Sequence, residues 1–210
     1  INTSTSVTGL IQIVSPAVNA IKINGKPYRG NILAQAEGQK LFIMNRVDLE
    51  QYLDGVLPRE VSSSWPEQAL KAQAVAARTY ALYHMVKRRQ DPFDVYATTS
   101  SQVYGGKEGE SPATHAAIAA TRGLVLTQDG KIILALFHAN SGGRTEAVEN
   151  IWGFTRPYLI NVKDSFSLQH PGDAWEKTFT ADELQERIKA FGLPSGSIED
   201  IVPVEKASSG

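Results

Sequence analysis

The chain has 210 residues, of which 42% are hydrophobic and 20% are charged, a composition typical of a globular protein that can bury a core. Its formal net charge is -1, and its Lys and Arg residues are scattered, so it lacks the basic patch typical of nucleic-acid-binding proteins. It contains no cysteine, which excludes disulfides, thiolate metal sites and cysteine nucleophiles.

The first 47 residues predict β-structure. Short alternating or β-branched runs separated by Gly, Pro and Asn are typical of strands. They cover Val7–Val14, Ala20–Ile23, Ile32–Ala36 and Leu41–Met44. Asn24-Gly25 predicts a hairpin turn of type I′, because both residues tolerate a positive φ.

Two helices are predicted next. Asp48 followed by Gln51 indicates a short helix of about Leu49–Val56, which Gly55 and Pro58 should limit. A longer helix should follow from Glu67 to about Arg89. Ser64 and Glu67 have the spacing of a capping box, and Pro66 suits the first turn. Its many alanines would let other elements pack closely around it, so we expect a central, buried helix.

The second half of the chain predicts two more helices and one hairpin. A helix from Pro112 to Arg122 is capped by Ser111 and stopped by Gly123. The hairpin pairs Leu124–Thr127 with Lys131–Ala139 around Asp129-Gly130. Thr180 and Glu183 form the capping box of the last helix, which should end near Phe191-Gly192.

These elements predict an α+β fold in which the alanine-rich helix packs with strands and hairpins and a substrate groove crosses one face. We expect one domain over 1–210, with the β-rich part of about 1–47 packed on it. The last residues, Ala207–Gly210, suggest that the natural chain continues further. Because the first residue is Ile1 rather than Met, a targeting segment is expected outside this sequence.

The longest nearly apolar stretch, Ile132 to Ala139, bears on membrane insertion. It is far shorter than the roughly 20 residues of a membrane-spanning helix. The sequence therefore predicts no membrane span within this chain.

Glu60 is a candidate catalytic residue because of its surroundings. It lies in an apolar link between two predicted helices, Gly55 to Val61. A partly desolvated carboxylic acid has a raised pKa, as a general acid near neutral pH requires. From spacing alone, an exposed Glu paired with a neighbouring Arg is the favoured interpretation.

Two segments resemble ligand-binding loops. Residues 98–106 concentrate hydroxyl, amide and aromatic groups suited to sugar binding, although a plain connector has the same composition. His138 closes a predicted buried strand before a loop that contains Gly142-Gly143, and such strand ends are common both as sites and as turns. Four dispersed histidines, at positions 84, 115, 138 and 170, predict no metal site and no cofactor.

Five sequence blocks together resemble the stage II sporulation protein D and amidase-enhancer family. They occur in the family's order over roughly residues 20 to 160, and the alanine-rich block is the most specific. The blocks are Asn24–Gly30, Glu50–Glu60, Glu67–Tyr80, Ser101–Gly106 and His138–Glu146.

The resemblance implies a peptidoglycan-active domain of the bacterial envelope, outside the cytoplasm. The family's sporulation member is a lytic transglycosylase of glycan strands whose stem peptides have been removed. The family's catalytic Glu corresponds to Glu60. Some members carry a zinc site of Cys and His, and this chain, without cysteine, departs from them.

The resemblance also indicates which residues are expected to contact the substrate. The expected sugar contacts are Gln102, Tyr104, His138 and Ser141 with Gly142 and Gly143. Arg78 and Arg144 are either cations of the substrate site or ion-pair partners within the fold. The competing interpretation is a module without catalysis that binds glycan and stimulates a cell-wall amidase. An ordinary hydrolase would need a second carboxylate across the cleft.

Overall fold

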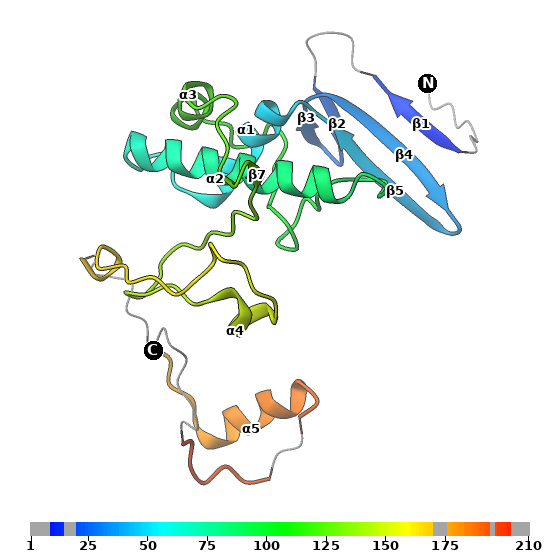
Figure 1. The fold of residues 1–210 in the computed structure, drawn as a ribbon. Coiled ribbons are helices and arrows are strands. Elements are labelled where there is room, and N and C mark those ends of the chain that lie inside the picture. Colours follow the sequence, from blue (N-terminus) through cyan, green and yellow to red (C-terminus); the bar gives the residue numbers. More distant parts are fainter. Residues whose placement is uncertain (1–8, 15–19, 170–175, 194–195, 203–210) are drawn as a thin grey trace. The chain divides into compact units, whose positions relative to one another are not determined.

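The structure is a computed structural model that describes residues 9–14, 20–169, 176–193 and 196–202 (Figure 1). The chain divides into two compact units, Ile1–Phe137 and His138–Gly210, and each is described by itself. Along the described residues, strands of small antiparallel sheets come first, and helices follow them, interrupted by one hairpin. The predicted α+β class is confirmed.

Five strands begin the described part of the first unit. A three-stranded antiparallel sheet has the order β1-β4-β5. Its strands are β1 (Leu10–Ile13), β4 (Asn31–Glu37) and β5 (Lys40–Arg46). The hairpin β2 (Ile21–Ile23) and β3 (Lys26–Tyr28) forms separately. Its turn has φ of 50° at Asn24 and 82° at Gly25, as predicted. The beginning of the predicted first strand, Val7 and Thr8, lies outside the described residues.

The helix α1 (Leu49–Glu60) is longer than predicted. Its N-cap is Asp48, whose side chain accepts hydrogen bonds from two backbone N–H groups of the first turn, as expected. The predicted end near Val56 is wrong. Leu57 is completely buried, and Pro58 lies in the last turn, where a missing N–H removes a single ladder bond. The helix therefore continues through Pro58, and Glu60 is its last residue.

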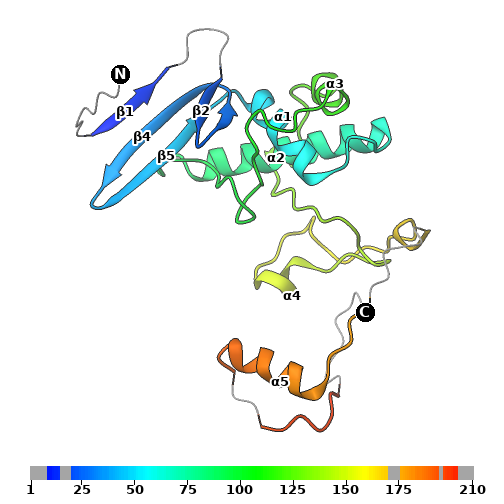
Figure 2. The ribbon, with the colours of Figure 1, turned by 180° about the vertical axis from the view of Figure 1, so that it is seen from behind.

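The helix α2 (Glu67–Lys87) packs against both α1 and α3 (Pro112–Ala120) (Figures 1 and 2). Three of its alanines are buried in the core between these helices: Ala74, Ala77 and Ala81. The predicted capping box is wrong, because Pro66 is the N-cap and the Ser64 hydroxyl instead hydrogen-bonds with that of Ser62 at 2.8 Å. The central position of the alanine-rich helix is as expected.

A short hairpin closes the first unit. The strands β6 (Thr127–Gln128) and β7 (Lys131–Ile132) are joined by Asp129-Gly130, with φ of 49° and 73°. The turn is confirmed, whereas the long second strand to Ala139 is wrong. Leu134 and Ala135 are buried without ladder pairing. The sequence shows that these residues are apolar and suited to burial. It does not show whether a neighbouring strand is available for them to pair with.

Three short helical elements lie in the described part of the second unit. They are α4 (Val148–Trp152), the 3-10 helix η1 (Ser167–Gln169) and α5 (Ala181–Ala190). The capping box of Thr180 and Glu183 forms as predicted. The predicted tail beyond residue 202 lies outside the described residues. No helix in the described part of the chain combines the length and the apolar character that crossing a bilayer needs.

Candidate functional site

Glu60 ends α1 as a half-buried carboxylic acid. Burial raises its pKa, and a hydrogen bond from the backbone N–H of Val103 lowers it to a smaller extent. The neighbouring Arg59 pairs instead with Glu108, at 3.6 Å. Among the described residues, no ion pair involves Glu60. The geometry thus favours a desolvated acid over an exposed Glu held by its neighbouring Arg.

The segment that reaches Glu60 is anchored on both sides of Val103. The buried Gln102 amide accepts a hydrogen bond from the Tyr52 hydroxyl at 3.2 Å and donates one to the carbonyl of Ala77 at 3.4 Å. The Tyr104 hydroxyl donates to the Asn45 side chain at 3.0 Å. These contacts fix the backbone of Val103 beside the carboxylic acid. The sequence did not single out Val103, because its backbone N–H, not its side chain, makes the contact.

The two expected sugar contacts in this segment are therefore engaged within the protein. Gln102 has 1% exposure, and the rings of Tyr52 and Tyr104 lie 5.0 Å apart. Burial raises the pKa of both tyrosines, so their hydroxyl groups stay protonated well above neutral pH. In this structure Gln102 and Tyr104 position the loop, and a direct contact with sugar stays a prediction.

Glycines bring the same loop against α1. The Gly105 N–H donates to the carbonyl of Gly55 at 3.1 Å, in the middle of the helix. A Cβ atom on Gly55 would lie 2.5 Å from the Gly106 carbonyl oxygen and 2.5 Å from the Tyr104 ring. Gly106 has a φ of 63° and approaches the Pro27 backbone of β3. The loop beside Glu60 thus packs tightly on both α1 and β3.

We expect Gly55→Ala to destabilise the protein by about 1–3 kcal/mol, as overpacking does. Elsewhere in a helix this change stabilises by up to about 1 kcal/mol, so the sign is diagnostic. Denaturant unfolding measures it. Gly196→Ala is the control, since its Cβ would meet nothing within 4 Å. A stabilised Gly55→Ala variant would show that the loop is not held against α1.

Arg78 is a buried ion-pair partner within the fold. It has 1% exposure, and two of its guanidinium nitrogens donate to the Glu50 carboxylate at 2.9 and 2.7 Å. It also donates to the carbonyls of Ile118 and Leu124, each at 3.2 Å. These contacts tie α2 to the start of α1, to α3 and to the segment after α3. Of the two roles left open for Arg78, the structure shows the ion pair.

The second unit holds the remaining expected contacts. His138 and Arg144 are exposed, and the Arg144 guanidinium donates to the Asn161 side chain. The Ser141 hydroxyl donates to Asp164 at 2.8 Å, and this bond holds the Asp164 pKa below its ordinary value. Asp164 was missed because nothing in its local sequence marks it.

Gly142 and Gly143 make the turn beside Ser141. Their φ values are 66° and 107°, and a Cβ on Gly143 would lie 2.9 Å from Leu168. Both positions thus favour glycine because of their backbone conformation, and Gly143 also because of its close approach to Leu168. That this turn and Glu60 contribute to one substrate site stays a prediction, because they belong to different units.

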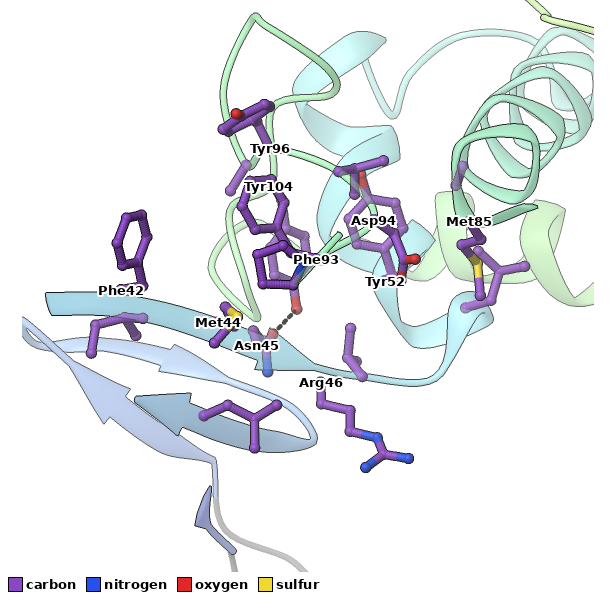
Figure 3. A pocket seen from close by; sticks show the side chains of 18 residues that line it. Phe42, Met44, Asn45, Arg46, Tyr52, Met85, Phe93, Asp94, Tyr96 and Tyr104 are labelled. Atoms are coloured by element: carbon purple, nitrogen blue, oxygen red, sulfur yellow. Dashed lines mark hydrogen bonds between the residues drawn. The ribbon is translucent and has the colours of Figure 1, made fainter. Parts of the chain in front are cut away.

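A cavity of about 600 Å³ lies in the first unit (Figure 3). Tyr52 and Tyr104 line it, but Glu60 does not. It is therefore separate from the candidate acid. Within the described residues no three His, Asp or Glu side chains gather as metal ligands, and His170 lies outside that part. The expected absence of zinc stays a prediction.

The first unit is an α+β domain that holds Glu60 as a half-buried carboxylic acid with a pKa raised by burial. A family model described as Stage II sporulation protein matches residues 37–128. The chain belongs to the family of stage II sporulation protein D and amidase enhancer.

Three curated relatives illustrate this membership. The amidase enhancer of Bacillus subtilis (strain 168) is 36% identical over 179 residues, which are 84% of this chain and 24% of that protein. Stage II sporulation protein D of the same organism is 35% identical over 160 residues, 69% of this chain and 47% of that protein. An uncharacterized protein of Brachyspira hyodysenteriae (strain ATCC 49526 / WA1) is 42% identical over 151 residues, 71% of this chain and 41% of that protein. The chain spans less than half the length of each.

Proposed function

We propose that this chain acts outside the cytoplasm on bacterial peptidoglycan, as a lytic transglycosylase with Glu60 as its single acid/base. Membership of a cell-wall-related family supports the substrate class. The observation that carries the reaction is the half-buried Glu60 carboxyl group, whose pKa is raised by burial and which has no cationic partner among the described residues.

In the proposed reaction Glu60 first acts as an acid. It gives its proton to the glycosidic oxygen between N-acetylmuramic acid and N-acetylglucosamine, and the bond from C1 to that oxygen breaks. A raised pKa keeps more of the carboxyl group protonated near neutral pH. After the proton has left, the Val103 N–H is placed to stabilise the carboxylate.

Glu60 then acts as a base. Its carboxylate takes the proton of the muramoyl C6 hydroxyl as that oxygen bonds to C1, which gives a 1,6-anhydromuramoyl end and restores the acid. No water is consumed. Because the nucleophile belongs to the same sugar, its effective concentration is high, and a second carboxylate is not needed. We assign sugar contacts to Tyr104, His138 and the Ser141–Arg144 turn, while Gln102 and Arg78 hold the scaffold.

The second candidate is a glycan-binding module that stimulates a cell-wall amidase without cutting. The observation that favours it is the similarity to the relative named Amidase enhancer. The matched residues make up 24% of the length of that relative. Both candidates require glycan binding by the same domain. They differ in whether Glu60 transfers a proton.

Product analysis tests the proposal. Purified glycan strands without stem peptides, incubated with the chain, are expected to yield fragments with 1,6-anhydromuramoyl ends, as measured by mass spectrometry. Such ends are 18 mass units lighter than hydrolytic reducing ends, roughly the mass of the water that is not consumed. Strands that bind but stay intact would favour the enhancer function. Reducing ends would indicate a hydrolase.

A further inference from the structure

The cavity of about 600 Å³ runs along one edge of the three-stranded sheet (Figure 3). Six consecutive residues, 42–47, line it. Successive side chains of a strand point to opposite faces, so a cavity that meets all of them lies along the strand's edge. Leu33 of β4 also lines it, so the cavity extends from this edge onto one face of the sheet. Its other walls come from α1, from the end of α2, from residues 92–97 and from Tyr104.

The strand β5 is the unpaired edge of this sheet, whose order is β1-β4-β5. Glu37 and Lys40 are paired across a two-residue connection, which makes them a hydrogen-bonded pair. By alternation, the backbone groups of Phe42, Met44 and Arg46 point to β4. Those of Leu41, Ile43 and Asn45 therefore point outward. Within the described residues, no backbone hydrogen bond satisfies them.

The apolar side chains beside this edge are partly exposed. Leu41, Phe42 and Ile43 have exposures of 64%, 38% and 45%. Native proteins usually protect a free edge with charges or proline, and the middle of β5 has neither. The cavity volume lies within the range of ligand sites, and aromatic rings line much of it, among them Phe93 and Tyr96.

Charge indicates what kind of strand fits. Lys40 and Arg46 flank the uncharged middle of β5, and neither forms an ion pair among the described residues. A second copy paired antiparallel about Ile43 would place Lys40 opposite the partner's Arg46, which is unfavourable. An acidic residue at each end of the added strand would instead meet both cations.

We propose that β5 is a docking edge for an extended segment of a partner protein, which adds to the sheet as a fourth strand. Its centre is apolar, with side chains in the aromatic cavity, and its two ends are acidic. Main-chain hydrogen bonds to Leu41, Ile43 and Asn45 supply affinity, and the cavity and the two cations supply specificity. This inference is independent of the proposed catalysis.

Two heptapeptides test the docking edge against the full chain. Fluorescence anisotropy compares labelled Glu-Thr-Phe-Thr-Val-Thr-Glu with a matched Lys-Thr-Phe-Thr-Val-Thr-Lys. The acidic peptide is expected to bind saturably and at least about threefold more tightly. The double variant Lys40→Glu with Arg46→Glu should reverse this preference. Equal binding of both peptides, or no saturable binding of either, would refute the proposal.

Backbone variants separate strand addition from simple hydrophobic contact. Ile43→Pro removes an outward N–H without removing a bond to β4, and edge strands tolerate proline. It should weaken binding by about tenfold, whereas Ile43→Val should not. Equal binding by the two variants would exclude strand addition. Sedimentation of the free chain tests the remaining alternative, in which a second copy of the chain occupies the edge. A dimer that Ile43→Pro dissociates would show this and would overturn the proposal.

Discussion

Glu60→Gln is expected to reduce the rate of glycan-strand cleavage by about 100- to 10,000-fold, the usual contribution of general acid/base catalysis. Gln keeps the size of Glu and can still accept the Val103 N–H, but it cannot give a proton to the leaving oxygen. The rate at which 1,6-anhydromuramoyl ends appear measures the loss. Glycan binding, measured by co-sedimentation with intact strands, should remain nearly unchanged.

Glu108→Gln is the matched control for this variant. Glu108 pairs at the protein surface with Arg59, the residue before Glu60, so its loss should leave cleavage at the parent rate. If Glu60→Gln still released anhydro ends at the parent rate, Glu60 would not be the acid. The enhancer function, or another carboxylate, would then replace the proposal.

Stability gives an independent check on the raised pKa of Glu60. A raised folded-state pKa means that the folded protein holds this proton more tightly than the unfolded chain does. The resulting stabilisation is present below the unfolded-state pKa and is lost as the pH rises through the folded-state value. Gln does not titrate. The melting temperature of Glu60→Gln relative to the parent should therefore increase from acidic to neutral pH.

The sequence predicted the half-buried setting of Glu60 better than the contacts of the residues around it. The apolar link and the family blocks both indicate Glu60, and local signals place the Asn24-Gly25 turn, the Asp48 cap and the Thr180 capping box. Each of these depends on residues within a few positions of one another. Local chemistry is what a single sequence reports most directly.

The contacts of the expected site residues depend on partners that are distant in the chain. Gln102 reaches Tyr52 across 50 positions, and Arg78 reaches Ile118 across 40. No spacing rule reveals such pairs. A polar residue in a motif therefore looks the same in the sequence whether it binds a ligand or supports the fold. The end of α1 was missed for a related reason, because burial of Leu57 outweighs the unfavourable effect of Pro58.

Glu50→Ala is expected to lower the free energy of unfolding by about 3 kcal/mol. It would leave the Arg78 guanidinium, with 1% side-chain exposure, without its carboxylate partner at 2.7 Å. The value lies at the lower end of the range for breaking buried pairs, since the Ile118 and Leu124 carbonyls still accept from Arg78. Chemical denaturation followed by circular dichroism measures the change.

The exposed pair between Glu67 and Lys71 provides the comparison. Glu67 is 71% exposed, and its replacement by Ala should lower the free energy of unfolding far less than Glu50→Ala does. The double variant Glu50→Ala with Arg78→Met should be more stable than Glu50→Ala alone, because Met removes the unpaired buried charge and fills much of its volume. A double variant less stable than the single one would mean that Arg78 stabilises the fold chiefly through its bonds to the carbonyl oxygens. The pair with Glu50 would then be secondary, and the start of α1 would not depend on it.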